Sequence, residues 1–114
     1  MHELSIAMSI VELAERHARE RQATAIEEIE LEIGELAAVD IASLDFSLAS
    51  AVKETLAEKA KITHHIIPGE GVCESCGATV PMPSISQACP GCGSWQVRLT
   101  SGKELRVKSI VVNT

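Results

Sequence analysis

Residues 73–93 of this 114-residue chain read CESCGATVPMPSISQACPGCG and hold all four of its cysteines. The cysteines form two pairs, Cys73 with Cys76 and Cys89 with Cys92, and a glycine directly follows each pair. Two residues between paired cysteines allow both thiolates to point at one centre, and the glycine lets the backbone turn tightly behind them. The pattern therefore predicts one tetrahedral metal site with four sulfur ligands, which leaves no open coordination position for catalysis.

Zinc is the favoured ion for such a site, although tetrahedral sulfur ligation also suits iron. A pair of redox dithiols is the alternative, but a thioredoxin-type CxxC would open a helix after a strand. The cysteine-rich segment has about 30 residues and few large apolar side chains, so it cannot bury a core unaided. We expect metal binding to supply much of its folding free energy, on the order of 10 kcal/mol or more.

The residues before the first cysteine mark a domain boundary. Pro68-Gly69-Glu70-Gly71 interrupts both helical and strand periodicity. The net charge also changes there, from −8 over residues 1–72 to +2 over residues 73–114. We therefore expect one domain from residues 1–70 and 103–114, and an inserted metal-binding domain from residues 71–102.

Apolar periodicity outside the insertion predicts two helices and three strands. A broad apolar face from Leu4 to about Ala18 indicates the first helix, and Asp40 stands where the N-cap of a second belongs. The second apolar stripe continues through Thr55, so the second helix is expected to reach that residue. Strands are predicted where apolar residues alternate with glutamates up to Gly34, and over the β-rich stretches Ile62–Ile67 and Leu105–Val112.

The order helix, strand, helix, strand, insertion, strand predicts an α+β fold. Two strands make a poor sheet, so the last strand is expected to return to the first domain. The expected architecture is a small three-stranded sheet covered by two helices, with an inserted zinc-ribbon-like domain.

Composition argues against several functional classes. Aromatic residues make up 2% of the chain and the net charge is −6, which disfavours a nucleic-acid partner. No apolar run is long enough for a membrane span, and the first residues lack the features of a signal peptide, so we expect a cytoplasmic protein with reduced thiols. No catalytic triad spacing, phosphate-binding glycine loop or HExxH motif is present, so no enzyme is predicted.

His2 is a candidate ligand because an apolar helical pattern begins only two residues after it. The amine of Met1, the amides of His2 and Glu3 and the imidazole of His2 can form adjacent chelate rings. Such a planar nitrogen set suits Ni(II) or Cu(II). His17 is expected at the surface, and the neighbours His64 and His65 are expected on opposite faces of a strand, where they cannot readily share one metal.

Several segments together resemble the HypA/HybF family of nickel-delivery proteins. They are Met1-His2-Glu3-Leu4-Ser5, Ile33-Gly34-Glu35-Leu36, Asp40, Ser43-Leu44-Asp45-Phe46, the two CxxCG turns, and Gly102-Lys103-Glu104-Leu105-Arg106-Val107-Lys108-Ser109-Ile110. The resemblance covers essentially the whole chain in the right order. The CxxCG turns alone occur in many zinc ribbons, and their combination with the Met-His-Glu start is more specific.

The resemblance implies a nickel metallochaperone for [NiFe]-hydrogenase maturation, with a nickel-binding domain and a structural zinc domain. His2 would be the essential nickel ligand, with Met1 and the backbone of Glu3, and Asp40 is a further candidate. Cys73, Cys76, Cys89 and Cys92 would bind zinc. The implied partners are the GTPase HypB, the hydrogenase large subunit and, for some members, urease maturation proteins.

Two other functions fit parts of the pattern. A rubredoxin-like electron carrier would use Cys-Pro-Gly-Cys-Gly for iron, but it would need neither residues 1–72 nor a site so poor in aromatic residues. A zinc ribbon that binds nucleic acid would need a basic surface stripe, which this acidic chain lacks.

Overall fold

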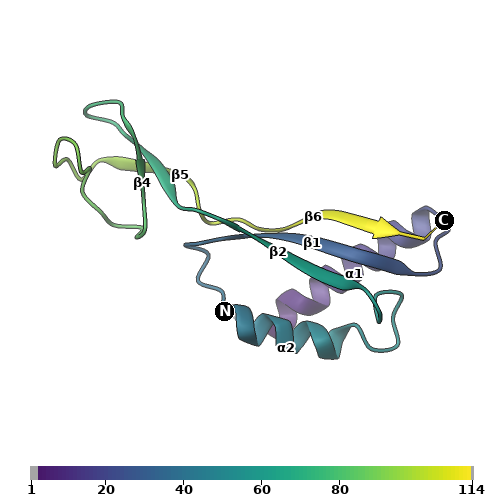
Figure 1. Cartoon of the computed structure of the whole chain (residues 1–114). Coiled ribbons are helices and arrows are strands. Elements are labelled where there is room, and N and C mark those ends of the chain that lie inside the picture. Colours follow the sequence, from purple (N-terminus) through teal and green to yellow (C-terminus); the bar gives the residue numbers. More distant parts are fainter. Residues whose placement is uncertain (1–2, 114) are drawn as a thin grey trace. The chain divides into compact units, whose positions relative to one another are not determined.

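The computed structural model describes residues 3–113. Its elements in chain order are α1 (Glu3–Glu20), β1 (Ile26–Gly34), α2 (Ile41–Ala51), β2 (Lys61–Ile67), β3 (Glu70–Cys73), β4 (Thr79–Pro81), β5 (Val97–Ser101) and β6 (Leu105–Val112) (Figure 1). The chain forms two compact units. One comprises the residues up to Leu31, Val39–His65 and the residues from Arg106 onward, and the other comprises Glu32–Ala38 and Ile66–Leu105.

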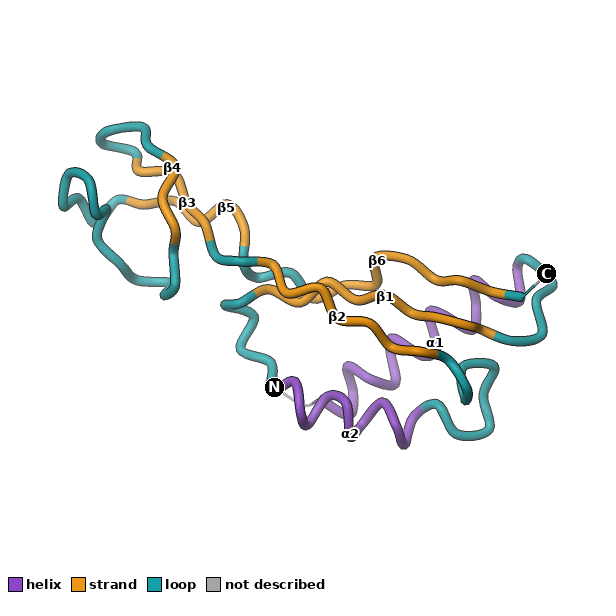
Figure 2. Tube along the Cα trace, viewed as in Figure 1, coloured by secondary structure: helices purple, strands orange, loops and turns teal. Residues whose placement is uncertain are grey.

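The first unit is built on a three-stranded sheet in the order β2-β1-β6. The last strand does return to pair with β1, as predicted, and just beyond one end of the pair the backbone N–H of Asn113 donates to the carbonyl of Ala25. Both helices lie on the same side of this sheet (Figures 1 and 2). The α+β prediction is confirmed.

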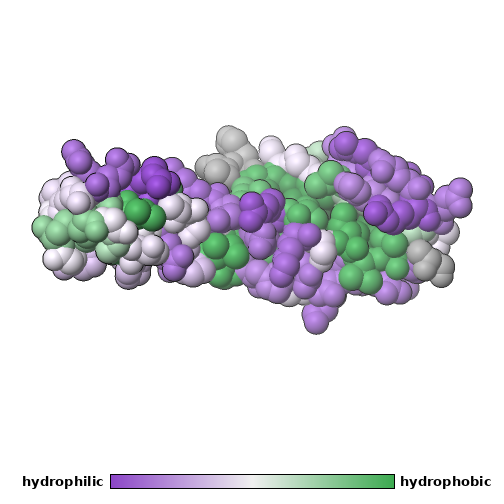
Figure 3. All heavy atoms as spheres, turned by 90° about the horizontal axis from the view of Figure 1, so that it is seen from above, coloured by the Kyte–Doolittle hydropathy of each residue, from purple (hydrophilic) through white to green (hydrophobic). Residues whose placement is uncertain are grey.

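Alternation along β1 decides which face of the sheet the helices cover. Ile29 and Leu31 are almost fully buried, whereas Glu28 and Glu30 are half-buried on the other face. The view from above shows hydrophilic and hydrophobic residues side by side over this unit (Figure 3). On this other face the carboxylates of β1 accept hydrogen bonds from neighbouring strands: Glu28 from the Thr63 hydroxyl, and Glu30 from the Ser109 hydroxyl and the His65 imidazole.

Small residues on α1 allow close packing in the first core. Ala7, Ala14 and Ala18 have no exposed surface, and they contribute to the core with Leu44 and Leu48 of α2. The helix predicted from Leu4 to about Ala18 runs from Glu3 to Glu20. Neither of the two helices among residues 3–113 combines the length and apolar character that a membrane crossing requires.

The second helix is shorter than predicted. It ends at Ala51 instead of continuing to Thr55, because Glu54 adopts a left-handed backbone conformation with φ of 62°. The Thr55 hydroxyl donates to the carbonyl of Val52 at 2.6 Å, and the N–H of Glu54 donates to the carboxylate of Glu58 at 2.8 Å. Local side-chain hydrogen bonds therefore stabilise this turn, although the sequence has no glycine there to predict it.

The second unit has a sheet of its own, which the sequence did not predict. Strand β3 lies between β4 and β5 and pairs antiparallel with both. A small core of Cys73, Val80, Met82 and Cys89 lies beside it, with Leu36, Val97 and Leu99 packed against this core. Leu36 comes from outside residues 71–102, so the idea that these residues form a separate domain stays a prediction.

Candidate metal centre

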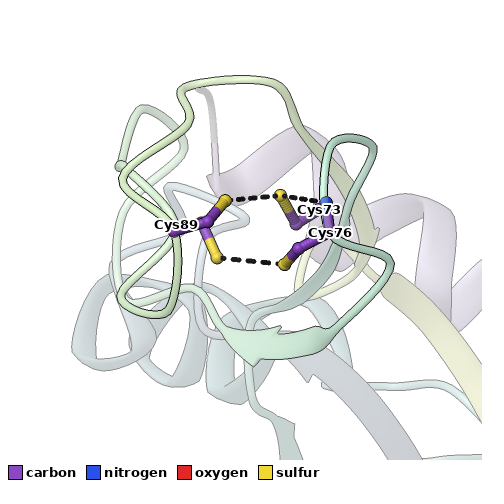
Figure 4. Close-up of side chains that lie close together, drawn as sticks. Cys73, Cys76 and Cys89 are labelled. Atoms are coloured by element: carbon purple, nitrogen blue, oxygen red, sulfur yellow. Dashed lines mark hydrogen bonds between the residues drawn. The ribbon is translucent and has the colours of Figure 1, made fainter.

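The four cysteines lie together in the second unit. Their sulfur atoms are all within 4.8 Å of one another, and Figure 4 shows those of Cys73, Cys76 and Cys89 pointing toward a common centre. Two of the separations are 3.5 Å, between Cys73 and Cys92, and 3.8 Å, between Cys76 and Cys89. Four sulfurs bound tetrahedrally at about 2.3 Å from zinc lie about 3.8 Å apart, so the cluster has the size that zinc requires.

Local backbone structure positions each pair. Cys73 ends β3, the N–H of Cys76 donates to the Cys73 sulfur at 3.4 Å, and the N–H of Gly77 donates to the Cys73 carbonyl at 2.8 Å. The second pair repeats this last bond from Gly93 to the carbonyl of Cys89, also at 2.8 Å. Gly77 and Gly93 both have positive φ, near 78°, as glycine at this position was expected to provide.

The sulfur atoms have different electrostatic surroundings. Donation from the backbone N–H of Cys76 lowers the pKa of Cys73 to about 6, and the N–H groups of Cys92 and Gly91 lower the pKa of Cys89. The N–H of Ser94 acts to lower the pKa of Cys92, yet the other three cysteines and burial together raise it to about 11. The neighbouring sulfurs thus disfavour ionisation of Cys92, and a divalent cation among them would favour its thiolate form.

The site has a buried and an exposed side. Cys73 and Cys89 are buried in the small core, whereas Cys76 and Cys92 are exposed, and all four are free thiols. Their sulfur separations of 3.5 and 3.8 Å are far longer than the roughly 2.05 Å of a disulfide. The cluster therefore fits a metal site of four thiolates better than it fits redox disulfides.

Two contributors to this centre were not predicted from the sequence. The hydroxyl of Ser75 donates to that of Ser94 at 2.9 Å and links the two cysteine turns directly. Leu36 packs on the core beneath Cys73 and Cys89 from a segment 37 residues before the first cysteine. The serines could have been noticed as neighbours of the two motifs, but nothing in the spacing indicated Leu36.

The candidate nickel residues are only partly described. Met1 and His2 lie outside residues 3–113. Glu3 begins α1, and its carboxylate accepts a hydrogen bond of 3.4 Å from the backbone N–H of Asp40. Asp40 is the N-cap of α2, as predicted, and its own carboxylate accepts from the N–H of Ser43 at 3.1 Å.

The neighbouring histidines His64 and His65 have separate carboxylate partners. His64 Nε2 lies 2.9 Å from Oδ1 of Asp45 on α2, at ion-pair distance but without hydrogen-bond geometry. His65 Nε2 donates to Oε1 of Glu30 on β1 at 3.1 Å. His17 is exposed on α1. The two neighbouring histidines therefore contact different elements and do not converge on one site.

Comparison with known proteins gives the family. A family model described as "Hydrogenase/urease nickel incorporation, metallochaperone, hypA" matches residues 1–112. The hydrogenase maturation factor HypA of Parabacteroides distasonis is 54% identical over 112 residues, which are 98% of this chain and 97% of that protein. The chain belongs to the HypA family. It is therefore a metallochaperone of hydrogenase and urease nickel incorporation rather than a member of a catalytic family.

Further relatives extend the match to solved structures. HypA of Prosthecochloris aestuarii is 43% identical over 98% of this chain and 99% of its own length. The solution structure of the Ni metallochaperone HypA from Helicobacter pylori is 29% identical with a TM-score of 0.70, covering 98% of this chain and 97% of that one. A second HypA solution structure, also 29% identical, gives a TM-score of 0.75 over 99% and 97% of the two chains.

Proposed function

We propose that the chain binds Ni(II) at its N-terminus and delivers it during [NiFe]-hydrogenase maturation, while its four cysteines hold a structural zinc ion. The observation that carries this proposal is the nickel-incorporation family match over residues 1–112, which includes both donor sets. The Helicobacter pylori relative of similar fold is itself named a Ni metallochaperone. The clustered cysteines support a second, chemically different metal site.

The two donor sets suit retention and transfer respectively. Four thiolates form a closed site from which zinc does not readily leave, and the zinc ion would stabilise the fold of this unit. The proposed nickel ligands are the imidazole of His2, the amine of Met1 and the amides of His2 and Glu3. Nickel binding there displaces protons from nitrogen, so it becomes weaker as the pH falls, and such a site can also release its cargo.

Asp40 is the proposed additional nickel ligand. Its backbone N–H donates to the carboxylate of Glu3, which brings the start of α2 beside the first turn of α1. Asp40 is exposed, and a carboxylate next to a cationic cargo would add favourable charge. The proposed recipients and helpers are the hydrogenase large subunit, the GTPase HypB and urease maturation proteins.

The nickel proposal is tested by titrating Ni(II) into zinc-loaded protein. We expect the untagged form to bind one nickel ion, and a form extended by a few residues at the N-terminus to bind none. His2→Ala should likewise lose nickel with its zinc content unchanged, whereas His17→Ala, which alters an exposed histidine on α1, should behave like the original. Stoichiometric nickel in His2→Ala, or equal binding by the extended form, would contradict the N-terminal site.

Metal analysis of the same preparations tests the zinc assignment. One zinc ion per chain is expected, with no visible colour. A red protein containing iron would replace zinc with an iron–thiolate centre and would revive the electron-carrier alternative.

A further inference from the structure

The first unit has a groove that the proposed metal chemistry does not use. It lies between the second half of α1 and strand β6 and has a volume of about 290 Å³. Aliphatic side chains and cationic groups share its lining, which consists of Leu13, His17, Arg21, Val107, Lys108, Ser109, Ile110 and Val112. No carboxylate residue belongs to this lining, although acidic residues outnumber basic ones by 16 to 10 in the chain.

Strand β6 leaves one of its sides unpaired. It stands at the end of the sheet order β2-β1-β6, so among residues 3–113 no strand pairs with its outer edge (Figure 1). An outer edge offers a row of backbone N–H and C=O groups to another extended chain. Val111 on this strand is 43% exposed, so the edge also carries apolar surface that water does not favour.

A groove between an edge strand and a helix is the geometry in which proteins bind extended peptides. Such a peptide adds a strand through main-chain hydrogen bonds, and its alternate side chains enter the groove beside the helix. The apolar lining here suits aliphatic side chains, and Arg21 and Lys108 suit carboxylates. Charge therefore decides which extended segments fit this groove.

We propose that the edge of β6 and the groove beside α1 bind an extended segment of a partner protein in which acidic residues alternate with aliphatic ones. The segment would pair with β6 as a fourth strand of the sheet. It would place its carboxylates against Arg21 and Lys108 and its aliphatic side chains against Leu13 and Ile110. This interaction requires neither nickel nor the cysteine site, so its test is independent of the test of the proposed function.

The probe is a fluorescein-labelled decapeptide of alternating valine and glutamate, and its counterpart has lysine in place of glutamate. Binding to the zinc-loaded full chain is followed by fluorescence anisotropy. We expect a dissociation constant on the order of 100 μM for the acidic peptide and at least tenfold weaker binding of the basic one. Affinity for the acidic peptide should fall as salt is added.

Charge-reversal variants identify the groove. Arg21→Glu and Lys108→Glu should each weaken binding of the acidic peptide about fivefold or more, since each replaces attraction by repulsion. Arg16→Glu is the matched control, because it makes the same charge change on α1, close to Arg21 in sequence, but lines a different pocket with Glu12 and Glu15. The affinity of Arg16→Glu for the acidic peptide should stay within about twofold of that of the original protein. Circular dichroism establishes that each variant is folded before its binding is compared.

Amide hydrogen exchange distinguishes strand addition from loose charge attraction. Saturating acidic peptide should slow exchange along β6 and leave the other edge strand, β2, unchanged. Absence of binding at about 1 mM peptide, equal binding of the basic peptide, or protection of β2 instead would overturn the proposal. So would sedimentation of the free protein as a dimer that Lys108→Glu dissociates, because a second copy would then occupy the groove.

Discussion

A short chain of polar side chains crosses the sheet of the first unit at Glu30. The hydroxyl of Ser109 on β6 and the imidazole of His65 on β2 both donate to this carboxylate. These two hydrogen bonds, that from Ser109 first, lower the pKa of Glu30 below its ordinary value of 4.5. One half-buried carboxylate thus links all three strands of the sheet through side chains as well as through the backbone.

Replacing Ser109 by alanine should raise the pKa of Glu30 toward its ordinary value. A carboxylate whose pKa is lowered by folding stabilises the folded state above its ordinary pKa, and this stabilisation is lost as the pH falls through the lowered value. When the pH is lowered, Ser109→Ala should therefore unfold at a higher pH than the original protein. Carbon NMR titration of the Glu30 carboxyl measures the pKa directly.

Thr63→Val provides the control for this titration. The Thr63 hydroxyl donates to the neighbouring carboxylate, Glu28, at 2.6 Å, so its loss removes a similar bond on the same face. The pKa of Glu30 should not respond to it. If Ser109→Ala and Thr63→Val moved the pKa of Glu30 equally, the hydroxyl of Ser109 would not be the cause.

The start of α2 depends on Asp40, which has an extended backbone and accepts from the N–H of Ser43. Asp40→Ala should lower the free energy of unfolding by about 1 kcal/mol, because it leaves an N–H at the helix start without its partner. Asp40→Asn keeps an oxygen in the same place and should retain most of the stability. Urea denaturation monitored by circular dichroism gives both values.

The same pair of variants separates capping from cargo binding. If Asp40 also serves as a nickel ligand, Asp40→Asn should weaken nickel binding while leaving the helix intact. Equal destabilisation by alanine and asparagine would show that the cap contributes nothing through its side-chain oxygen.

Helix starts were easier to predict here than helix ends. Asp40 has a side chain that can cap only a helix start, so sequence alone located that boundary. The end at Ala51 depends on Glu54 adopting a positive φ, supported by hydrogen bonds to Thr55 and Glu58 side chains nearby. Ala57, beyond this turn, is buried as well, so the apolar pattern continues past Ala51 and does not reveal the end of the helix.

The cysteine site was predictable for a different reason. All four cysteines lie in two short motifs whose spacing indicates their geometry directly, and the sulfurs do converge. The three strands around them have only four, three and five residues, too few for a periodic pattern to stand out. The sheet of this unit therefore appears only when its backbone pairing is known.

The two units are not consecutive pieces of chain, and Leu36 is a residue of the second unit that lies far from the cysteines in sequence. Its N–H donates to the carbonyl of Gly102 at 2.7 Å, and its side chain lies against Gly69 and Gly102. A Cβ atom on Gly102 would come 2.7 Å from the Cα of Gly69, so these segments pack backbone to backbone. A residue that follows β1 thus completes the core beneath the cysteines.

This arrangement predicts that metal retention depends on a residue far from the cysteine motifs in sequence. Leu36→Ala removes a half-buried side chain from the core that contains Cys73 and Cys89, at a cost of about 2 kcal/mol. Zinc should pass faster to a colorimetric chelator, and the second unit should unfold at lower urea concentration. Ile85→Ala is the matched control, since Ile85 belongs to the same unit but is 58% exposed. Equal zinc release from the two variants would mean that residues 71–102 hold their metal without help from the segment after β1, and that the two parts of the chain fold independently.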